Sequence, residues 1–138
     1  MSFRTLLIIK AMVCLFFGVF LLAAPSTLLG ILGANLSAAG MFTGREYGSA
    51  LMGAFFLTWF ARNVRASDAR YAILLYLMVY DAIAMVVTLH AVLSGTLNQL
   101  GWAIVAVYAF FAAAPGLLLI RAAPVHLDDA RGDQHHGN

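Results

Sequence analysis

An aspartate stands in the middle of a long apolar run of this chain. The stretch RYAILLYLMVYDAIAMVVTLH contains Asp81, which follows Arg70 by eleven residues. On a helix this separation is roughly 16 Å, which would bring the carboxyl group close to the midplane of a membrane. A charge at that depth costs about 2.5 to 3.5 kcal/mol on insertion scales. We therefore expect the carboxyl group to be paired, hydrogen-bonded or protonated.

Lys10 is the nearest basic residue that could pair with Asp81. On an antiparallel first helix it would lie roughly 8 Å inside the same membrane boundary, and its long side chain can reach further inward. We predict a Lys10–Asp81 ion pair, joined by a hydroxyl group of Tyr80 or Thr58. Two interpretations are open: a buried pair that fixes helix register, or a site for a proton, a cation or a substrate amine.

A second polar group is expected near the opposite end of the bundle. Arg45 and Glu46 are adjacent in sequence and point about 100° apart on a helix, so they do not suit each other as partners. His90 reaches a similar level and is the predicted partner of Glu46. A headgroup or anion contact and ordinary snorkelling of Arg45 are alternative interpretations. A quinone contact at His90 is a further one, whereas a bis-histidine haem would need a second histidine within an apolar segment.

The remaining reactive residues do not form a catalytic pattern. Cys14 is the one cysteine of the chain, so we expect a small packing residue and no disulfide. His135 and His136 belong to a polar end that we expect to be solvated. The chain has no P-loop, HExxH or nucleophile elbow. We therefore predict a protein that is not an enzyme, with no metal site and no cofactor.

Composition places these residues in a membrane. Of the 138 residues, 63% are apolar and 10% are charged, and the mean hydropathy is +0.91, far from the composition of a water-soluble domain. Four apolar segments have the length of a membrane-spanning helix. The predicted fold is all-α, an up-down bundle of four transmembrane helices in residues 1–121, followed by a polar tail in residues 122–138. The predicted spans are about 5–24, 42–61, 71–93 and 100–120.

The distribution of basic residues predicts the orientation. One side of the predicted bundle carries Arg4, Lys10, the three arginines of the second linker, Arg121 and Arg131, and the other side carries Arg45 alone. The positive-inside rule then puts both termini in the cytoplasm, for a multi-pass protein of the inner (plasma) membrane. A cleaved signal peptide is the rival interpretation of the N-terminus, but Lys10 interrupts its apolar core. We read no nucleic-acid partner into the net charge of +2.

Small residues recur at helical spacing in three spans and predict close helix packing. They would serve contacts within the bundle, a homo-oligomer or contacts with other membrane subunits equally well. The predicted packing residues are Gly44, Gly48, Gly53, Ala106, Ala109, Ala113 and Gly116.

The layout resembles that of a known group. A first span ending at Pro25, Arg45 and Gly48 opening the second span, Arg62 closing it, and Asn98 with Trp102 opening the fourth are similar to small bacterial four-helix proteins of the DoxX-like and related unknown-function groups. The resemblance implies a four-helix membrane fold without an assigned reaction.

Three functions are consistent with these features. The leading expectation is a structural or accessory subunit of a membrane complex, packed through its Gly/Ala faces. The main rival is a carrier or channel-like protein that uses Asp81 and Lys10. The third is a quinone- or lipid-binding redox accessory with an apolar slot near His90 and Trp102.

Overall fold

A computed structural model of the chain describes residues 1–65 and 67–122, and these residues form five helices. They are α1 (Phe3–Ala23), α2 (Pro25–Ile31), α3 (Ala38–Ala61), α4 (Ser67–Leu93) and α5 (Gly101–Ala122). The predicted all-helical fold class is confirmed in this part of the chain. Residues 123–138 of the predicted tail, including His135 and His136, lie outside it.

Local chemistry sets the helix boundaries. The Ser2 side chain accepts a hydrogen bond from the Thr5 backbone N–H and caps α1. Pro25 is the first residue of α2, where its missing N–H costs nothing, so the chain breaks between α1 and α2 as expected. Ser37 caps α3 through the Gly40 N–H. This cap starts α3 before residue 42, where the predicted span began, and α2 was not predicted as a helix.

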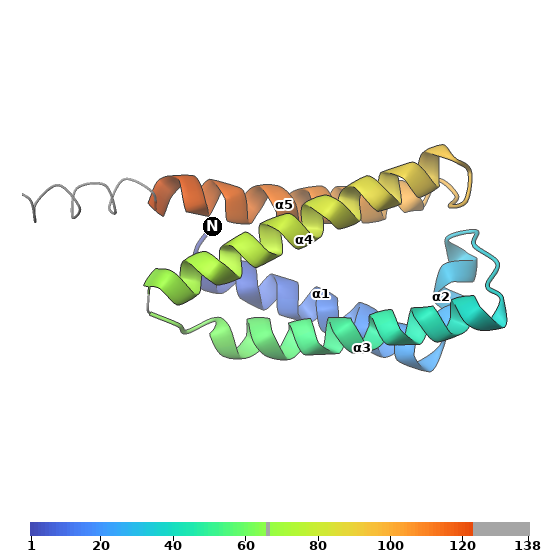
Figure 1. Cartoon of the computed structure of the whole chain (residues 1–138), viewed down its shortest axis with the longest axis horizontal. Coiled ribbons are helices and arrows are strands. Elements are labelled where there is room, and N and C mark those ends of the chain that lie inside the picture. Colours follow the sequence, from blue (N-terminus) through green and yellow to red (C-terminus); the bar gives the residue numbers. More distant parts are fainter. Residues whose placement is uncertain (66, 123–138) are drawn as a thin grey trace, which may run out of the picture.

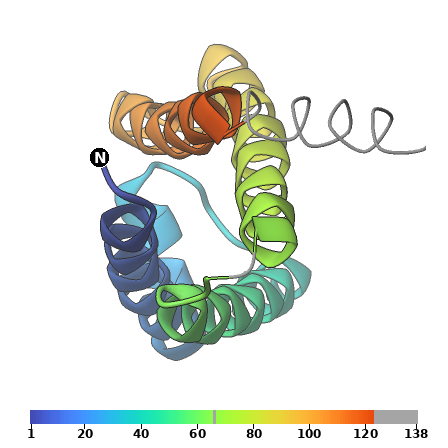
Figure 2. The ribbon, with the colours of Figure 1, turned by 90° about the vertical axis from the view of Figure 1, so that its left-hand side faces the viewer.

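The four long helices form two antiparallel pairs. α1 packs along α3, and α4 packs along α5. Figure 1 shows that the start of α1, the end of α3, the start of α4 and the end of α5 lie at one end of the molecule, with α2 near the other end. Seen end-on in Figure 2, the long helices follow one another around a common axis in the order α1, α3, α4, α5.

Glycines allow the closest of these helix contacts. A Cβ atom on Gly48 would lie 3.0 Å from the Gly18 carbonyl oxygen and 3.0 Å from the Leu22 backbone nitrogen. On Gly44 it would lie 3.1 Å from Pro25 of α2, and on Gly116 it would lie 3.4 Å from the Met78 sulfur of α4. At each of these three glycines another helix of the chain therefore lies close by.

Other predicted packing residues face away from the rest of the chain. A Cβ atom on Gly53 would meet no atom within 4 Å, and Ala106 and Ala113 are exposed, while Ala109 is half-buried. Gly53, Ala106 and Ala113 therefore do not pack against other helices of the described chain, which leaves a homo-oligomer or another membrane subunit among their predicted contacts. The inward face of α5 instead carries larger residues, Phe111 and Pro115, both fully buried. α3 packs closely against α1 and α2.

Three of the described helices are long and apolar enough to cross a membrane: α1, α4 from Asp68 and α5 as far as Ile120. This indicates a membrane protein. α3 has 24 residues, and Arg45 and Glu46 fall within its first half. Large apolar side chains on the outer surface, among them Phe16, Phe60 and Val87, suit a lipid environment.

The end of the molecule that holds the start of α1 is tightly packed. Buried apolar side chains from all four long helices meet there, with Arg70 of α4 lying 4.5 Å from the centre of the Phe3 ring of α1. This core consists of Phe3, Leu6, Leu7, Ala61, Leu74, Leu77 and Phe111. Half-way along the molecule the packing changes, and this is where the polar residues lie.

Candidate functional site

Lys10 and Asp81 form the ion pair that their positions predicted. Lys10 Nζ lies 2.5 Å from Asp81 Oδ1, and the two side chains are 4% and 0% exposed. The pair joins α1 to α4, and therefore joins the two helix pairs to each other. Asp81 Oδ2 is buried and accepts no hydrogen bond within the part of the chain that is described.

Aromatic rings surround the ammonium group. Lys10 Nζ lies 4.5 Å from the centre of the Phe111 ring and 5.6 Å from that of Tyr80. Such cation–π contacts stabilise a desolvated ammonium group. The two predicted hydroxyl partners do not join the pair: Tyr80 donates its hydrogen bond to Tyr47, and Thr58 bonds to carbonyl oxygens of its own helix.

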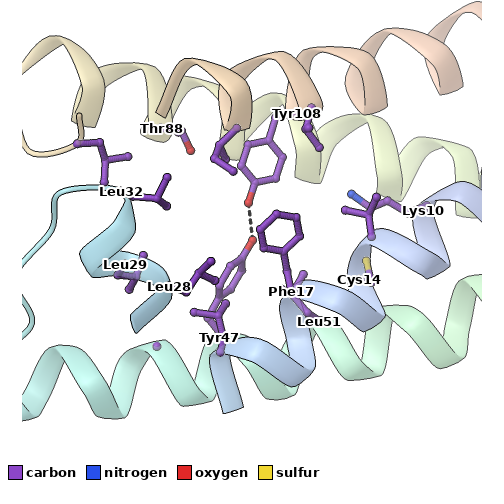
Figure 3. A pocket seen from close by; sticks show the side chains of 16 residues that line it. Lys10, Cys14, Phe17, Leu28, Leu29, Leu32, Tyr47, Leu51, Thr88 and Tyr108 are labelled. Carbon is purple, nitrogen blue, oxygen red and sulfur yellow. Dashed lines mark hydrogen bonds between the residues drawn. The ribbon is translucent and has the colours of Figure 1, made fainter. Parts of the chain in front are cut away.

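Beyond the ion pair a cavity of about 210 Å³ lies between the helices. Its walls are mostly apolar side chains of α1, α3 and α5, and Lys10 lies at its inner end (Figure 3). Leu28, Leu29 and Leu32, from α2 and the residue after it, line the opposite end. The packed core lies on the far side of Lys10, so the cavity occupies one half of the molecule.

Three tyrosines from three helices form a chain of hydroxyl groups beside the cavity. Tyr80 of α4 donates to Tyr47 of α3 at 3.0 Å, and the Tyr47 and Tyr108 hydroxyl oxygens lie 2.6 Å apart. Figure 3 shows Tyr47 and Tyr108 pointing toward each other from opposite sides of the cavity. Tyr47 and Tyr108 are not among the residues that the sequence predicted for the site. Their position in apolar segments could have indicated that they need partners, because a phenol hydroxyl group far from the membrane boundary requires a hydrogen bond.

A groove on the outer surface shares three residues with the cavity. Tyr47, Tyr108 and Thr88 line both, and the groove continues over Ile83 and Val87 of α4. Ile83 and Val87 are more than half exposed on the face that suits lipid. The tyrosine hydroxyl groups thus stand between the cavity and the lipid-facing surface.

The short helix α2 is held over the end of the cavity by the α4–α5 loop. Asn98 donates its side-chain N–H to the Ile31 carbonyl oxygen and its backbone N–H to the Leu32 carbonyl oxygen, both at 2.8 Å. The neighbouring Leu97 lines the cavity. Gly33 makes room for this contact, since its φ of 87° is unfavourable for other residues and a Cβ there would lie 3.1 Å from Asn98.

The predicted outer cluster is not assembled. Arg45, Glu46 and His90 are all exposed, and no ion pair or hydrogen bond joins Glu46 to His90 in the described residues. The prediction of that contact was wrong, because α3 and α4 do not pack closely along their lengths. Neither His90 nor Trp102 lines the cavity, so this cavity is not the slot expected near these two residues.

Cys14 is a buried free thiol whose side chain lines the cavity, beyond the packing role that its sequence position indicated. Within the described ranges no group of three His, Cys, Asp or Glu side chains could hold a metal ion.

The helices and the cavity together define the class: a helical membrane protein with a largely apolar cavity between its helices and a buried ion pair at one end of it. Neither a family model, nor a curated protein, nor a solved structure matches the chain.

Proposed function

We propose that this chain is a four-span protein of the inner membrane, with both ends on the cytoplasmic side, that binds a lipophilic small molecule in its cavity. The observation that carries this proposal is the position of the cavity, which is lined mainly by apolar side chains and borders a lipid-facing groove. Pockets with many apolar walls and a few polar groups are the usual form of small-molecule sites.

The packed core between the ion pair and the start of α1 favours a ligand-binding protein over a carrier or channel. A carrier or channel needs a polar path through the membrane, whereas Leu6, Leu7, Leu77 and Phe111 fill the centre beyond Lys10. Asp81 is fully buried and does not line the cavity. In this proposal the ion pair therefore forms a fixed polar boundary at one end of the cavity. The proposal assigns no enzymatic activity to the chain.

The size of the cavity limits the ligand. A dry cavity of about 150 Å³ holds one benzene molecule, so about 210 Å³ accommodates roughly one substituted ring. A longer ligand would leave its chain in the groove between Tyr47 and the exposed side of α4, in contact with lipid. A lipid-like or quinone-like molecule has this shape.

Saturable binding in lipid nanodiscs tests the proposal. The probe is radiolabelled 1-ethyl-4-hexylbenzene, a ring with one short and one long alkyl chain, measured as counts above those of protein-free nanodiscs. We expect about one bound probe per chain. Leu29→Trp, which fills the cavity, should abolish binding, whereas Val19→Trp on the exposed side of α1 should leave it unchanged.

Equal, unsaturable partitioning into nanodiscs with and without protein would contradict the proposal. So would saturable binding that Leu29→Trp leaves unchanged, because the probe would then lie elsewhere.

The second candidate function is the accessory subunit expected from the sequence. The outward positions of Gly53, Ala106 and Ala113 favour it, since small residues on a lipid-facing surface allow another helix to approach. The mass of the particle extracted in mild detergent distinguishes the two candidates. A stoichiometric partner protein supports the subunit role. The resemblance to DoxX-like proteins stays a prediction.

A further inference from the structure

The tyrosine chain has more hydroxyl hydrogens than hydrogen bonds. Tyr80, Tyr47 and Tyr108 carry three O–H donors, and two hydrogen bonds join them. Tyr80 donates its hydroxyl hydrogen to the Tyr47 hydroxyl oxygen. If Tyr47 donates to Tyr108, the hydroxyl hydrogen of Tyr108 takes part in neither of these two hydrogen bonds. If Tyr108 donates to Tyr47 instead, the same holds for the hydroxyl hydrogen of Tyr47. In either case one donor remains at the Tyr47–Tyr108 contact, where both side chains line the cavity.

Lys10 is a poorer hydrogen-bond donor to a ligand than the Tyr47–Tyr108 pair. One of its N–H groups is held by Asp81, and its ammonium group lies against the faces of Phe111 and Tyr80. These contacts already stabilise the charge. Turning an N–H group toward a ligand would weaken them, whereas the unspent tyrosine hydrogen gives up no hydrogen bond.

The charges near the cavity exclude an ionised ligand head. Lys10 and Asp81 neutralise each other at its inner end, and no other charged side chain lines it. A carboxylate or phosphate would bring an unpaired charge into an apolar space at a high cost in solvation. An uncharged acceptor, such as a ketone, quinone or ester carbonyl oxygen, carries no such cost and can accept the tyrosine hydrogen bond.

We propose that the cavity selects a neutral, carbonyl-bearing lipophile and that the Tyr47–Tyr108 pair donates a hydrogen bond to its carbonyl oxygen. This rests on the proposed function, namely that a lipophilic molecule binds in the cavity. The carbonyl group would lie beside the two hydroxyl groups, and the alkyl chain would pass them into the groove that begins at Tyr80 and Thr88.

A matched pair of probes tests the selectivity. 4′-Hexylacetophenone and 1-ethyl-4-hexylbenzene differ by a carbonyl oxygen in place of two hydrogens. In nanodiscs containing the full chain we expect the ketone to bind about three- to tenfold more tightly, the range that one net hydrogen bond gives. The infrared C=O stretch of the bound ketone should move to a lower wavenumber than in protein-free nanodiscs, which a merely structural role of the tyrosines would not produce.

Removing the tyrosine hydroxyl groups one at a time and then together tests which of them donates to the ketone. Tyr108→Phe leaves the Tyr47 hydrogen unspent and Tyr47→Phe leaves that of Tyr108, so each single variant should keep the shifted C=O stretch. The double variant Tyr47→Phe/Tyr108→Phe should lose both the shift and the preference for the ketone, while still binding the hydrocarbon. Tyr71→Phe, on an exposed part of α4, should behave as the unchanged chain does.

The outcomes separate the two proposals. Saturable binding of both probes with equal affinity, or a ketone preference that survives the double variant or is lost in Tyr71→Phe, overturns the tyrosine inference and leaves the binding function standing. Absence of saturable binding of either probe overturns both. If the double variant fails to fold, the C=O stretch in the unchanged chain decides: an unshifted band overturns the inference.

Discussion

The Lys10–Asp81 pair is a short contact of 2.5 Å between two almost completely buried side chains. A buried ion pair need not add net stability, because removing two charges from water offsets their attraction. Breaking such a pair is costly, however, since one charge is then left alone in an apolar environment. The pair is therefore better suited to fixing the alignment of α1 with α4 than to increasing stability.

Substitution of one partner should be far more damaging than substitution of both. We expect Asp81→Leu to lower the free energy of unfolding by about 3–5 kcal/mol, because Lys10 is left unpaired. Lys10→Met with Asp81→Leu should return it to within about 1 kcal/mol of the unchanged chain. SDS titration from mild detergent measures these values, with Glu46→Gln, at an exposed position, as the control. A double variant as unstable as the single one would contradict the argument.

Sequence could predict the ion pair but not the tyrosine chain. A charge deep in an apolar segment requires compensation, and Lys10 was the one lysine within reach. A hydroxyl group can be satisfied by many partners, including its own backbone, as Thr58 is. Which partner it takes depends on helix rotation, and helices that are apolar on every side give little indication of rotation. Tyr47 and Tyr108 were missed for this reason.

At the scale of elements, the contact between α1 and α3 depends on the absence of side chains at one point. Gly18 and Gly48 face each other there, and a Cβ on Gly48 would press on the backbone of α1 rather than on a movable side chain. Gly53, five residues further along the same helix, has open space around it. The sequence did not separate the two, because small residues occupy much of the circumference of α3.

This difference gives a matched pair of variants. We expect Gly48→Ala to lower the free energy of unfolding by about 1–3 kcal/mol, since α1 must move to accept the methyl group. Gly53→Ala should raise it by up to about 1 kcal/mol, because alanine is the better helix former and no atom opposes it. The same SDS titration measures both. Equal effects would mean that α1 and α3 do not approach at Gly48.

The short helix α2 was also beyond prediction from sequence. Pro25 correctly marked the end of the first helix, and the segment after it was expected only to connect the first two predicted spans. Instead it turns inward over the cavity, because Asn98 binds the carbonyl groups at its end from the α4–α5 loop. Contacts between residues 67 positions apart depend on the tertiary structure and leave little trace in local pattern.

For the whole molecule, the proposed topology depends on whether α3 crosses the membrane. α1, α4 and α5 have the length and apolarity to do so, and α3 lies alongside α1 for most of its length. The end that holds the start of α1 also holds Arg62 and Arg70, stacked on Trp59 and Phe3 respectively. In the proposed topology this end lies in the cytoplasm, as the positive-inside rule predicts.

Single cysteines introduced into a Cys14→Ser chain test this topology. Asn35→Cys precedes α3 and Asn63→Cys follows it, and both positions are exposed. We expect a membrane-impermeant maleimide to label Asn35→Cys in intact cells and to label Asn63→Cys only after the cells are permeabilised. Thr96→Cys, in the α4–α5 loop, should behave as Asn35→Cys does. Labelling of Asn35→Cys and Asn63→Cys from the same side would show that α3 does not cross.

The separation of Lys10 from Asp81 along the chain has a consequence for biosynthesis. The partners are 71 residues apart, so at a synthesis rate of about 5–20 residues per second the lysine emerges roughly 4–14 s before the aspartate does. During that interval α1 carries an uncompensated ammonium group. Insertion of α1 should therefore depend on a protein-lined or hydrated site at the translocation machinery until α4 arrives, and the ion pair marks the moment at which the nascent chain can be released into lipid.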